Sequence, residues 1–133
     1  MTIQLSTAVR SGMLDAIETA DGTAAVVKSK TGAQPSDCAA ADSGTVLVSY
    51  TLGADWAAAA ASGSKSFSST PISGTASATG TAAHYRVYAS DGTTCHMQGT
   101  VATSGGDMTI DNTSITSGQS VNITSWSITG SNA

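Results

Sequence analysis

The sequence predicts an all-β protein, an antiparallel β-sandwich of the jelly-roll or Ig-like type with one short N-terminal helix. Its 133 residues suffice for a single domain, which we place over residues 1–133. After one helical segment, short β-rich runs recur at roughly ten-residue spacing, as in sandwiches. Ala, Ser, Thr and Gly make up more than half of the chain, and charged residues only 11%. Small side chains of this kind favour thin, closely packed layers.

The charge and hydropathy patterns exclude several classes of function. The net charge is −4 and the five basic residues are scattered, so no basic stripe can neutralise a run of phosphates. The sequence opens without a charged and apolar leader, and no uncharged stretch approaches the ~20 residues that cross a bilayer. We therefore expect a soluble protein, made in a cytoplasm, that binds neither nucleic acid nor membrane.

The two cysteines, Cys38 and Cys95, are expected to be reduced and buried, because a cytoplasm keeps thiols reduced. Neither belongs to a CxxC pair, and His84 and His96 add too few ligands for a structural zinc site. The acidic residues in 107–111 lack the alternating carboxylates and central Gly of a calcium-binding loop. We expect no metal and no cofactor.

Residues 7–20 carry the helical pattern of the chain. Ser6 or Thr7 can cap the start of this helix, and Gly22 can end it. Apolar residues follow one helical face: Val9, Met13, Ala16, Ile17 and Ala20. We expect this stripe to pack on the sheet of its own domain; the alternative is a docking face for a partner.

Two strands are expected at 24–29 and 45–52, separated by turn-rich sequence. The five alanines of 57–61 are too few for an independent helix, so we expect a single helical turn there. Trp56, just before them, is expected to fill the core and not to form a ligand platform.

Residues 62–82 consist almost entirely of Ser, Thr, Gly and Ala. The recurring Thr residues favour partly ordered strand with a mobile loop near Ser73 and Gly74. The alternative is a mobile arm that orders when a partner binds.

A β-hairpin is predicted over 82–101, with its turn at Asp91 and Gly92. One pairing sorts the apolar side chains to one face, and it needs an odd loop or a bulge near Thr93. This register pairs Ala89 with Cys95, Val87 with Met97, Tyr85 with Gly99 and Ala83 with Val101. We expect Tyr85, Val87, Met97 and Val101 to be buried, and Arg86 and Gln98 not to be.

The opposite face of the hairpin gathers polar side chains, His84 included. Four of them are candidate partner-binding residues, because Tyr and Arg are enriched at interface hot spots: Arg86, Tyr88, His96 and Gln98. The alternative is an ordinary solvated sheet face. No nucleophile, base and orienting group are clustered in the sequence, so we identify no catalytic residue and expect no enzyme.

The C-terminal part predicts two strands with a turn at Ser117 and Gly118. Val121 and Ile123 share one phase of alternation, whereas Trp126 and Ile128 have the other. A bulge or a change of sheet is therefore expected near Thr124 and Ser125.

Four segments of the chain, 6–22, 54–65, 83–100 and 105–133, contain the phrases Ala54-Asp55-Trp56-Ala57, His84-Tyr85-Arg86-Val87-Tyr88 and Gly105-Gly106-Asp107-Met108. Together these segments resemble a family of small virion structural proteins of tailed bacteriophages. The likeness covers nearly the whole chain and includes no catalytic signature.

The resemblance implies a capsid decoration, or cement, protein on the surface of the phage head. Its partner would be the major capsid protein, and it would form a homo-oligomer, a dimer or a trimer. The alternative is a tail or adhesin-type β-sandwich module that binds a glycan or host surface through exposed aromatic rings.

Overall fold

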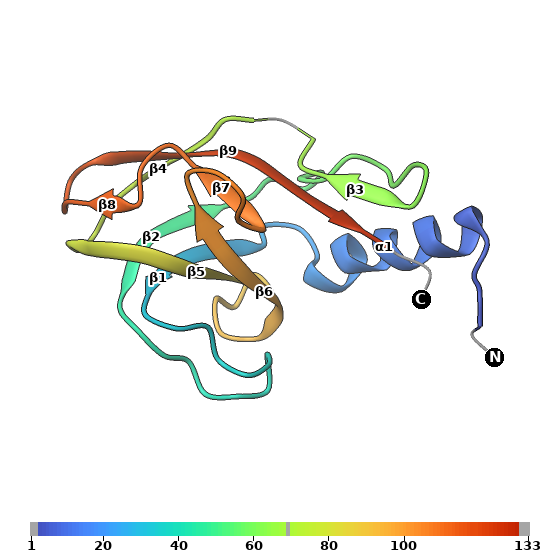
Figure 1. The fold of residues 1–133 in the computed structure, drawn as a ribbon, viewed down its shortest axis with the longest axis horizontal. Coiled ribbons are helices and arrows are strands. Elements are labelled where there is room, and N and C mark those ends of the chain that lie inside the picture. The colour runs from blue at the N-terminus through green and yellow to red at the C-terminus, as the bar shows by residue number, and fades with distance from the viewer. Residues whose placement is uncertain (1–2, 69, 131–133) are drawn as a thin grey trace.

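The computed structural model describes residues 3–68 and 70–130 and confirms an all-β protein with one N-terminal helix (Figure 1). The helix α1 (Thr7–Asp21) begins after Ser6, whose side chain accepts a hydrogen bond from the Val9 N–H, and ends at Gly22 with a positive φ. The strands are β1 (Val26–Thr31), β2 (Val46–Thr51), β3 (Ser64–Ser66), β4 (Ile72–Thr75), β5 (Gly80–Tyr88), β6 (Cys95–Ala102), β7 (Met108–Ile110), β8 (Ser114–Ile115) and β9 (Ser120–Thr129).

These strands form one curled sheet in the order β2-β1-β5-β6-β7-β9-β3, with β4 paired to β9 and β8 paired to β5. In Figure 1, β1, β2 and β5 lie on one side of the interior, and β9 and β4 on the other. An isolated bridge between Val48 in β2 and Ala76, just after β4, joins the two sides. The sheet therefore curls around its own core, as a sandwich or barrel-like fold requires.

The sheet is mixed and not purely antiparallel as predicted, because β6 and β7 run parallel. Val101 of β6 pairs with Met108 of β7 across a very short return. Asp107 holds this return: its carboxylate accepts hydrogen bonds from the N–H and the hydroxyl of Thr100, both at 2.9 Å. The Asp107 carboxylate thus makes the hydrogen bonds that a backbone carbonyl would make in an ordinary turn.

The predicted hairpin is formed by β5 and β6. Its register matches the prediction at two pairs, Val87 with Met97 and Tyr85 with Gly99. The register then shifts, so Cys95 pairs with Tyr88 and not with Ala89 as predicted. The additional residue on β6 is His96, which places the bulge three residues after Thr93.

The inward face of the hairpin is the predicted one. Tyr85, Val87 and Val101 are buried, and Met97 is half-buried. Gly99 lets the Tyr85 ring lie against β6, because a Cβ there would come within 2.8 Å of the ring. Burial raises the pKa of Tyr85 to about 12, and its hydroxyl accepts a hydrogen bond from Trp126 Nε1 at 2.8 Å.

An aromatic cluster closes the core beside α1. Trp56, Phe67 and Trp126 have ring centroids 4.9 to 5.9 Å apart. Both tryptophans are at most 4% exposed, which confirms the expected core position of Trp56. Such contacts add about 0.5–1.5 kcal/mol per pair to the burial of the rings.

The bulge expected in the last strand is present. Thr109 pairs with Ser125 and Ile110 with Ile123, which leaves Thr124 without a pairing partner on β7. The additional residue reverses the alternation, so Ile123 and Trp126 are both buried.

The alanine segment 57–61 is extended, so the predicted helical turn is wrong. The Ala57 N–H donates to Glu18 Oε1 at 3.3 Å, and the Ala60 N–H donates to Asp15 Oδ1 at 2.8 Å. The helix propensity of alanine exceeds that of ordinary residues by at most about 0.7 kcal/mol. These tertiary hydrogen bonds outweigh that preference.

Within 62–68 and 70–82 the chain contains β3, β4 and the start of β5. Ser73 and Gly74 lie inside β4, paired with β9, and not in a loop as predicted. A Cβ at Gly74 would come within 2.7 Å of the side chains of Tyr50 and Val48. Gly74 thus permits close packing of β4 on β2. A Ser-Gly pair is equally typical of a turn, so the sequence did not distinguish the two roles.

Candidate functional site

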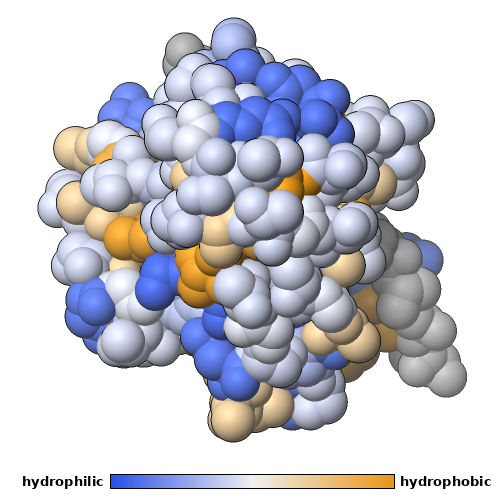
Figure 2. Space-filling model, turned by 90° about the vertical axis from the view of Figure 1, so that its left-hand side faces the viewer, coloured by the Kyte–Doolittle hydropathy of each residue, from blue (hydrophilic) through white to orange (hydrophobic). Residues whose placement is uncertain are grey.

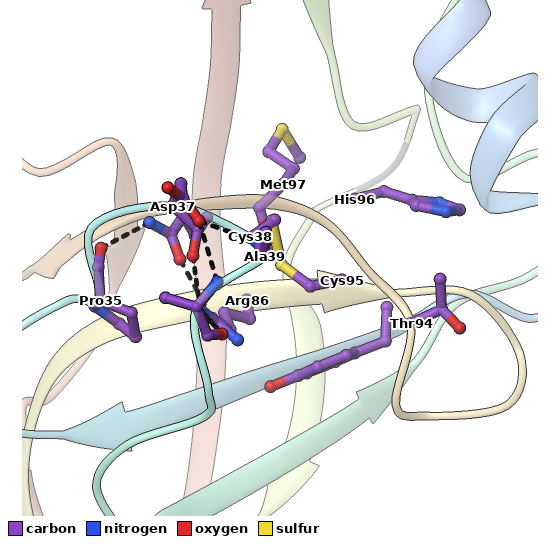
Figure 3. Close-up of a disulfide and its surroundings, with 12 residues drawn as sticks. Pro35, Asp37, Cys38, Ala39, Arg86, Thr94, Cys95, His96 and Met97 are labelled. Carbon is purple, nitrogen blue, oxygen red and sulfur yellow. Dashed lines mark hydrogen bonds between the residues drawn. A yellow bond between two sulfur atoms is a disulfide. The ribbon is translucent and has the colours of Figure 1, made fainter.

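The polar face predicted on the hairpin is covered by the loop that joins β1 to β2. We call residues 32–45 the covering loop, and Figure 3 shows its segment 35–39 passing over Arg86. Arg86 is only 2% exposed, and Tyr88 is fully buried. The expectation that Arg86 is not buried is therefore wrong: the face is polar, but it lies inside the molecule.

Arg86 bonds with all three of its guanidinium nitrogens. Nη1 lies 2.6 Å from Asp42 Oδ1, and Nε donates to Gln98 Oε1 at 3.0 Å. Nη2 donates to the carbonyl oxygens of Asp37 at 2.8 Å and Ala40 at 3.1 Å. One buried cation therefore binds three separate residues of the covering loop, so the charge is compensated by a carboxylate and by carbonyl dipoles.

Asp42 is the acidic partner of this cluster. Its Oδ2 lies 2.8 Å from Lys30 Nζ, and the Tyr88 hydroxyl is 2.8 Å from its carboxylate. Burial raises the pKa of Asp42, but the hydrogen bonds and charges of Lys30, Tyr88 and Arg86 outweigh burial and lower it to about 2. Burial and the adjacent carboxylate raise the pKa of Tyr88.

Two further side chains hold the beginning of the covering loop. Gln98 Nε2 donates to the Pro35 carbonyl at 2.7 Å, and His84 Nδ1 lies 2.9 Å from the Gly32 carbonyl oxygen. The outward groups of β5 and β6 thus bind backbone of the same chain.

A disulfide joins Cys38 of the covering loop to Cys95 at the start of β6, so the expectation of two reduced thiols is wrong (Figure 3). The Cα atoms are 5.3 Å apart, inside the roughly 4.4–6.8 Å that disulfides span. The loop brings together residues that are 57 positions apart. The even number of cysteines was the available signal, and the assumption of a reducing compartment concealed it.

His96 lies apart from the other candidate residues. In Figure 3 its ring points away from Arg86, and its Nδ1 is 2.8 Å from Oδ1 of Asp21, the last residue of α1. Asp21 is 2% exposed, and burial raises its pKa. The structure therefore brings Arg86, Tyr88 and Gln98 together under the covering loop and places His96 at the helix.

The charged side chains of α1 face the body of the protein. Arg10 Nη1 donates to the Gly130 carbonyl at 2.9 Å, and Ser11 accepts a hydrogen bond from the Gly63 N–H. Leu14, 5% exposed, is the apolar anchor between them. We call the inward residues Arg10, Ser11, Asp15, Glu18 and Asp21 the helix seam.

Lys65 of β3 is the cation that binds the acidic residues of the helix seam. Its ammonium lies 2.8 Å from Asp15 and 3.2 Å from Glu18, and its side chain is 1% exposed. Burial lowers the pKa of Lys65, but the two carboxylates outweigh burial and raise it. Hydrogen bonding by Lys65 and by the Ala60 N–H lowers the pKa of Asp15. The ion pairs of Lys65 with Asp15 and Glu18 thus attach the helix to β3.

The opposite side of α1 is apolar and faces solvent. Val9 is 48% exposed and Met13 is 60% exposed. Five exposed residues at helical spacing form this surface, which we call the outer strip: Val9, Gly12, Met13, Ala16 and Ala20. Only Ile17 of the predicted stripe packs against the core, so the expectation that the stripe packs on the sheet is wrong. The bonds of the helix seam fix the rotation of the helix and leave the strip outside.

The end of the molecule opposite α1 has a different surface. Figure 2 shows it as mostly white and blue, with hydrophobic colour in small areas. Within residues 3–68 and 70–130, the large hydrophobic side chains that are exposed are Ile3, Val9 and Met13. The large exposed apolar side chains among these residues therefore lie in the N-terminal helix and in the segment just before it.

The described residues offer little for a metal site, a membrane-spanning helix or a sugar-stacking ring. No three His, Cys, Asp or Glu residues there are grouped so that they could hold a metal ion. No helix among the described residues has the length and hydropathy needed to cross a membrane. Trp56 and Trp126 are buried, so neither presents an exposed ring on which a sugar could stack.

The fold and these surfaces define a disulfide-linked all-β domain with a closed polar face and one exposed apolar helix face. No protein-family model, curated protein or solved structure matches the chain.

Proposed function

We propose that this chain is a structural virion protein that decorates the capsid of a tailed bacteriophage and stabilises the head. The observation that carries the proposal is the outer strip of α1, because an uncharged apolar surface on a small domain is typical of protein contact. The sequence resemblance to phage virion proteins supplies the setting. The partners are the major capsid protein and further copies of the chain, and the role is mechanical.

The construction of the body supports this role. The buried cations Lys30, Arg86 and Lys65 each have acidic partners within the chain. The disulfide adds a covalent link that persists in oxidising surroundings, which a particle meets outside its host cell. These internal ion pairs and the disulfide hold the domain together. Contacts with the capsid would then form at its surface without rearrangement of its interior, as the cement role requires.

Weak contacts suffice for stabilisation of a shell. Each copy that binds the assembled capsid, and not its separated subunits, shifts the equilibrium towards the assembled state by mass action. Many copies act on one particle, so a modest free energy per copy accumulates. No catalytic group is required for this role.

The test compares phage particles that contain the protein with particles from which its gene is deleted. We expect about one copy per capsid subunit in the complete particles. The deleted particles should release their genome at a lower temperature, and after a smaller dilution of the salt, than the complete ones. Adding back the purified protein should restore resistance. Equal release from both kinds of particle contradicts the cement role. A few copies located at the tail would favour the adhesin-type module instead.

A further inference from the structure

We propose that α1 pairs with α1 of a second copy of this chain, antiparallel, with Val9 opposite Ala20 and Met13 opposite Ala16 of that copy. This inference deepens the proposed function, on which it rests for its place on the shell. The pairing itself is a property of the free protein, so it can be tested without particles.

The two sides of α1 are inverted relative to those of an ordinary surface helix. On an ordinary surface helix the apolar side faces the body and the charged side faces water. Here the helix seam directs Arg10, Asp15 and Glu18 towards the body, where their side chains are bonded. Met13, by contrast, is 60% exposed. A second protein surface that covers the strip would remove this exposed apolar area from water.

Side-chain size decreases along the outer strip from its N-terminal to its C-terminal half. The large side chains, Val9 and Met13, lie in the N-terminal half, and the small ones, Ala16 and Ala20, in the C-terminal half. Antiparallel pairing about the midpoint places each large side chain opposite an alanine. The surface is therefore complementary to itself, as a two-fold interface requires.

The charge distribution of α1 is complementary to that of a second, antiparallel copy. The outer strip carries no charge, and α1 has no acidic residue in its first turn and no basic residue in its last. The partial positive charge of the helix N-terminus and the partial negative charge of its C-terminus are thus uncompensated by side chains in these turns. Antiparallel pairing places each end beside the opposite end of the second helix.

The area of the strip sets the strength of the pair. A 15-residue helix is about 22 Å long and about 10 Å wide. Its face is smaller than the ~800 Å² per partner of a standard stable interface. We therefore expect a reversible dimer with a dissociation constant on the order of 0.1 mM. On a capsid lattice, where copies are held close together, such a contact forms readily.

A charged or lipid partner fits this surface less well. Membrane-binding helices usually carry Lys and Arg along the edges of the apolar face. In α1 the sole basic residue is Arg10, and it is bonded to Gly130 and Thr7.

Sedimentation equilibrium of the intact, oxidised protein from about 10 µM to 1 mM tests the pairing. We expect a monomer–dimer equilibrium, and a dissociation constant raised at least ~10-fold by Met13→Glu, which would bury a charge against alanine. Thr103→Glu, on an exposed residue beyond β6, adds the same charge and should leave the equilibrium unchanged. Circular dichroism should show that both variants are folded, because both positions are exposed.

A size exchange tests the register. Ala16→Met alone places methionine against methionine and should weaken the dimer. Adding Met13→Ala to it restores one large and one small side chain at each contact and should recover the wild-type dissociation constant.

The outcomes separate this inference from the proposed function. A monomer mass up to 1 mM, equal dimerisation of Met13→Glu and wild type, or no recovery in the double variant overturns the pairing. If a monomeric protein still binds particles through this strip, the occupant is the capsid protein and the decoration role stands. If the protein dimerises but never binds particles, the pairing stands and the decoration role fails.

Discussion

The covering loop and α1 are both attached to the sheet by buried cations, yet they leave very different surfaces outside. Arg86 and Lys30 hold the loop through Asp42, and Lys65 holds the helix through Asp15 and Glu18. The loop uses its backbone carbonyls as well, and a disulfide links it to β6.

The covering loop therefore closes the polar face of the sheet. The helix, by contrast, directs its polar side chains towards the body and leaves its apolar face exposed. The comparison teaches that polar sequence does not mark the exposed face of this molecule. Substitutions at the attachment points should therefore destabilise the loop or the helix, whereas substitutions on the outer strip should leave the monomer intact.

The largest expected effect is on the covering loop. Replacing both cysteines, Cys38→Ala with Cys95→Ala, removes a link that closes a separation of 57 residues. In the chain-entropy description such a link contributes about 4 kcal/mol to the free energy of unfolding. Urea denaturation measures the loss. Thiol titration of the denatured, unreduced wild type should give no free thiol, and two per chain would contradict the disulfide.

The helix attachment should respond next. Lys65→Met leaves Asp15 and Glu18 without their buried cation, and we expect a loss of about 2 kcal/mol, since both carboxylates are partly exposed. Hydrogen exchange should show faster exchange throughout α1 and little change in the covering loop. Lys28→Met is the control. Lys28 is half-buried, and its ammonium donates to the Gly92 carbonyl and lies over the Tyr88 ring without an acidic partner among the described residues, so its removal should cost less. Equal exchange in both variants would show that Lys65 does not hold the helix.

The attachment of the loop should depend on acid pH. The pKa of Asp42 is lowered from its ordinary value to about 2, so its contribution to stability is present above about pH 4 and lost as the pH falls towards 2. The Asp42 side chain is 45% exposed, so we expect about 1 kcal/mol or less. Unfolding by urea at several pH values between 5 and 2 measures it. Asp42→Asn should flatten this part of the profile, and an unchanged profile contradicts the assignment.

The smallest effect is expected on the outer strip. Met13→Gln changes a side chain that is 60% exposed in the monomer, so the free energy of unfolding at low concentration should change by no more than about 0.5 kcal/mol. Thermal unfolding of wild type and variant at a few micromolar measures the difference. A loss of 2 kcal/mol or more would mean that the strip is packed inside the monomer.

Local signals in the sequence predicted the elements whose patterns are local. Ser6 and Gly22 set the bounds of the helix, and alternation located the hairpin and the bulge at Thr124. Alternation could not show what covers each face of a sheet. Arg86 was therefore expected outside, because its partners are loop carbonyls and an aspartate 44 or more residues away.

The same limit applies to α1. The periodicity of Val9 and Met13 defined an apolar side correctly, but the rotation of the helix depends on Lys65 and on the N–H groups of Ala57 and Ala60. Hydrogen bonds from extended alanines have no pattern that a single sequence reveals. For this reason we propose the outer strip of α1, and not the hairpin face, as the contact surface.

One measurement tests the central contrast directly: solvent paramagnetic relaxation in NMR spectra of about 20 µM protein with a soluble, uncharged paramagnetic probe. We predict strong broadening of the methyl signals of Val9 and Met13, and none of the Val87 methyls or the Arg86 Nε–H, which are buried. Broadening of Arg86 equal to that of Met13 would show an open covering loop. Protection of Met13 at this dilution would show that the helix buries its apolar face within one chain, and either result contradicts the account.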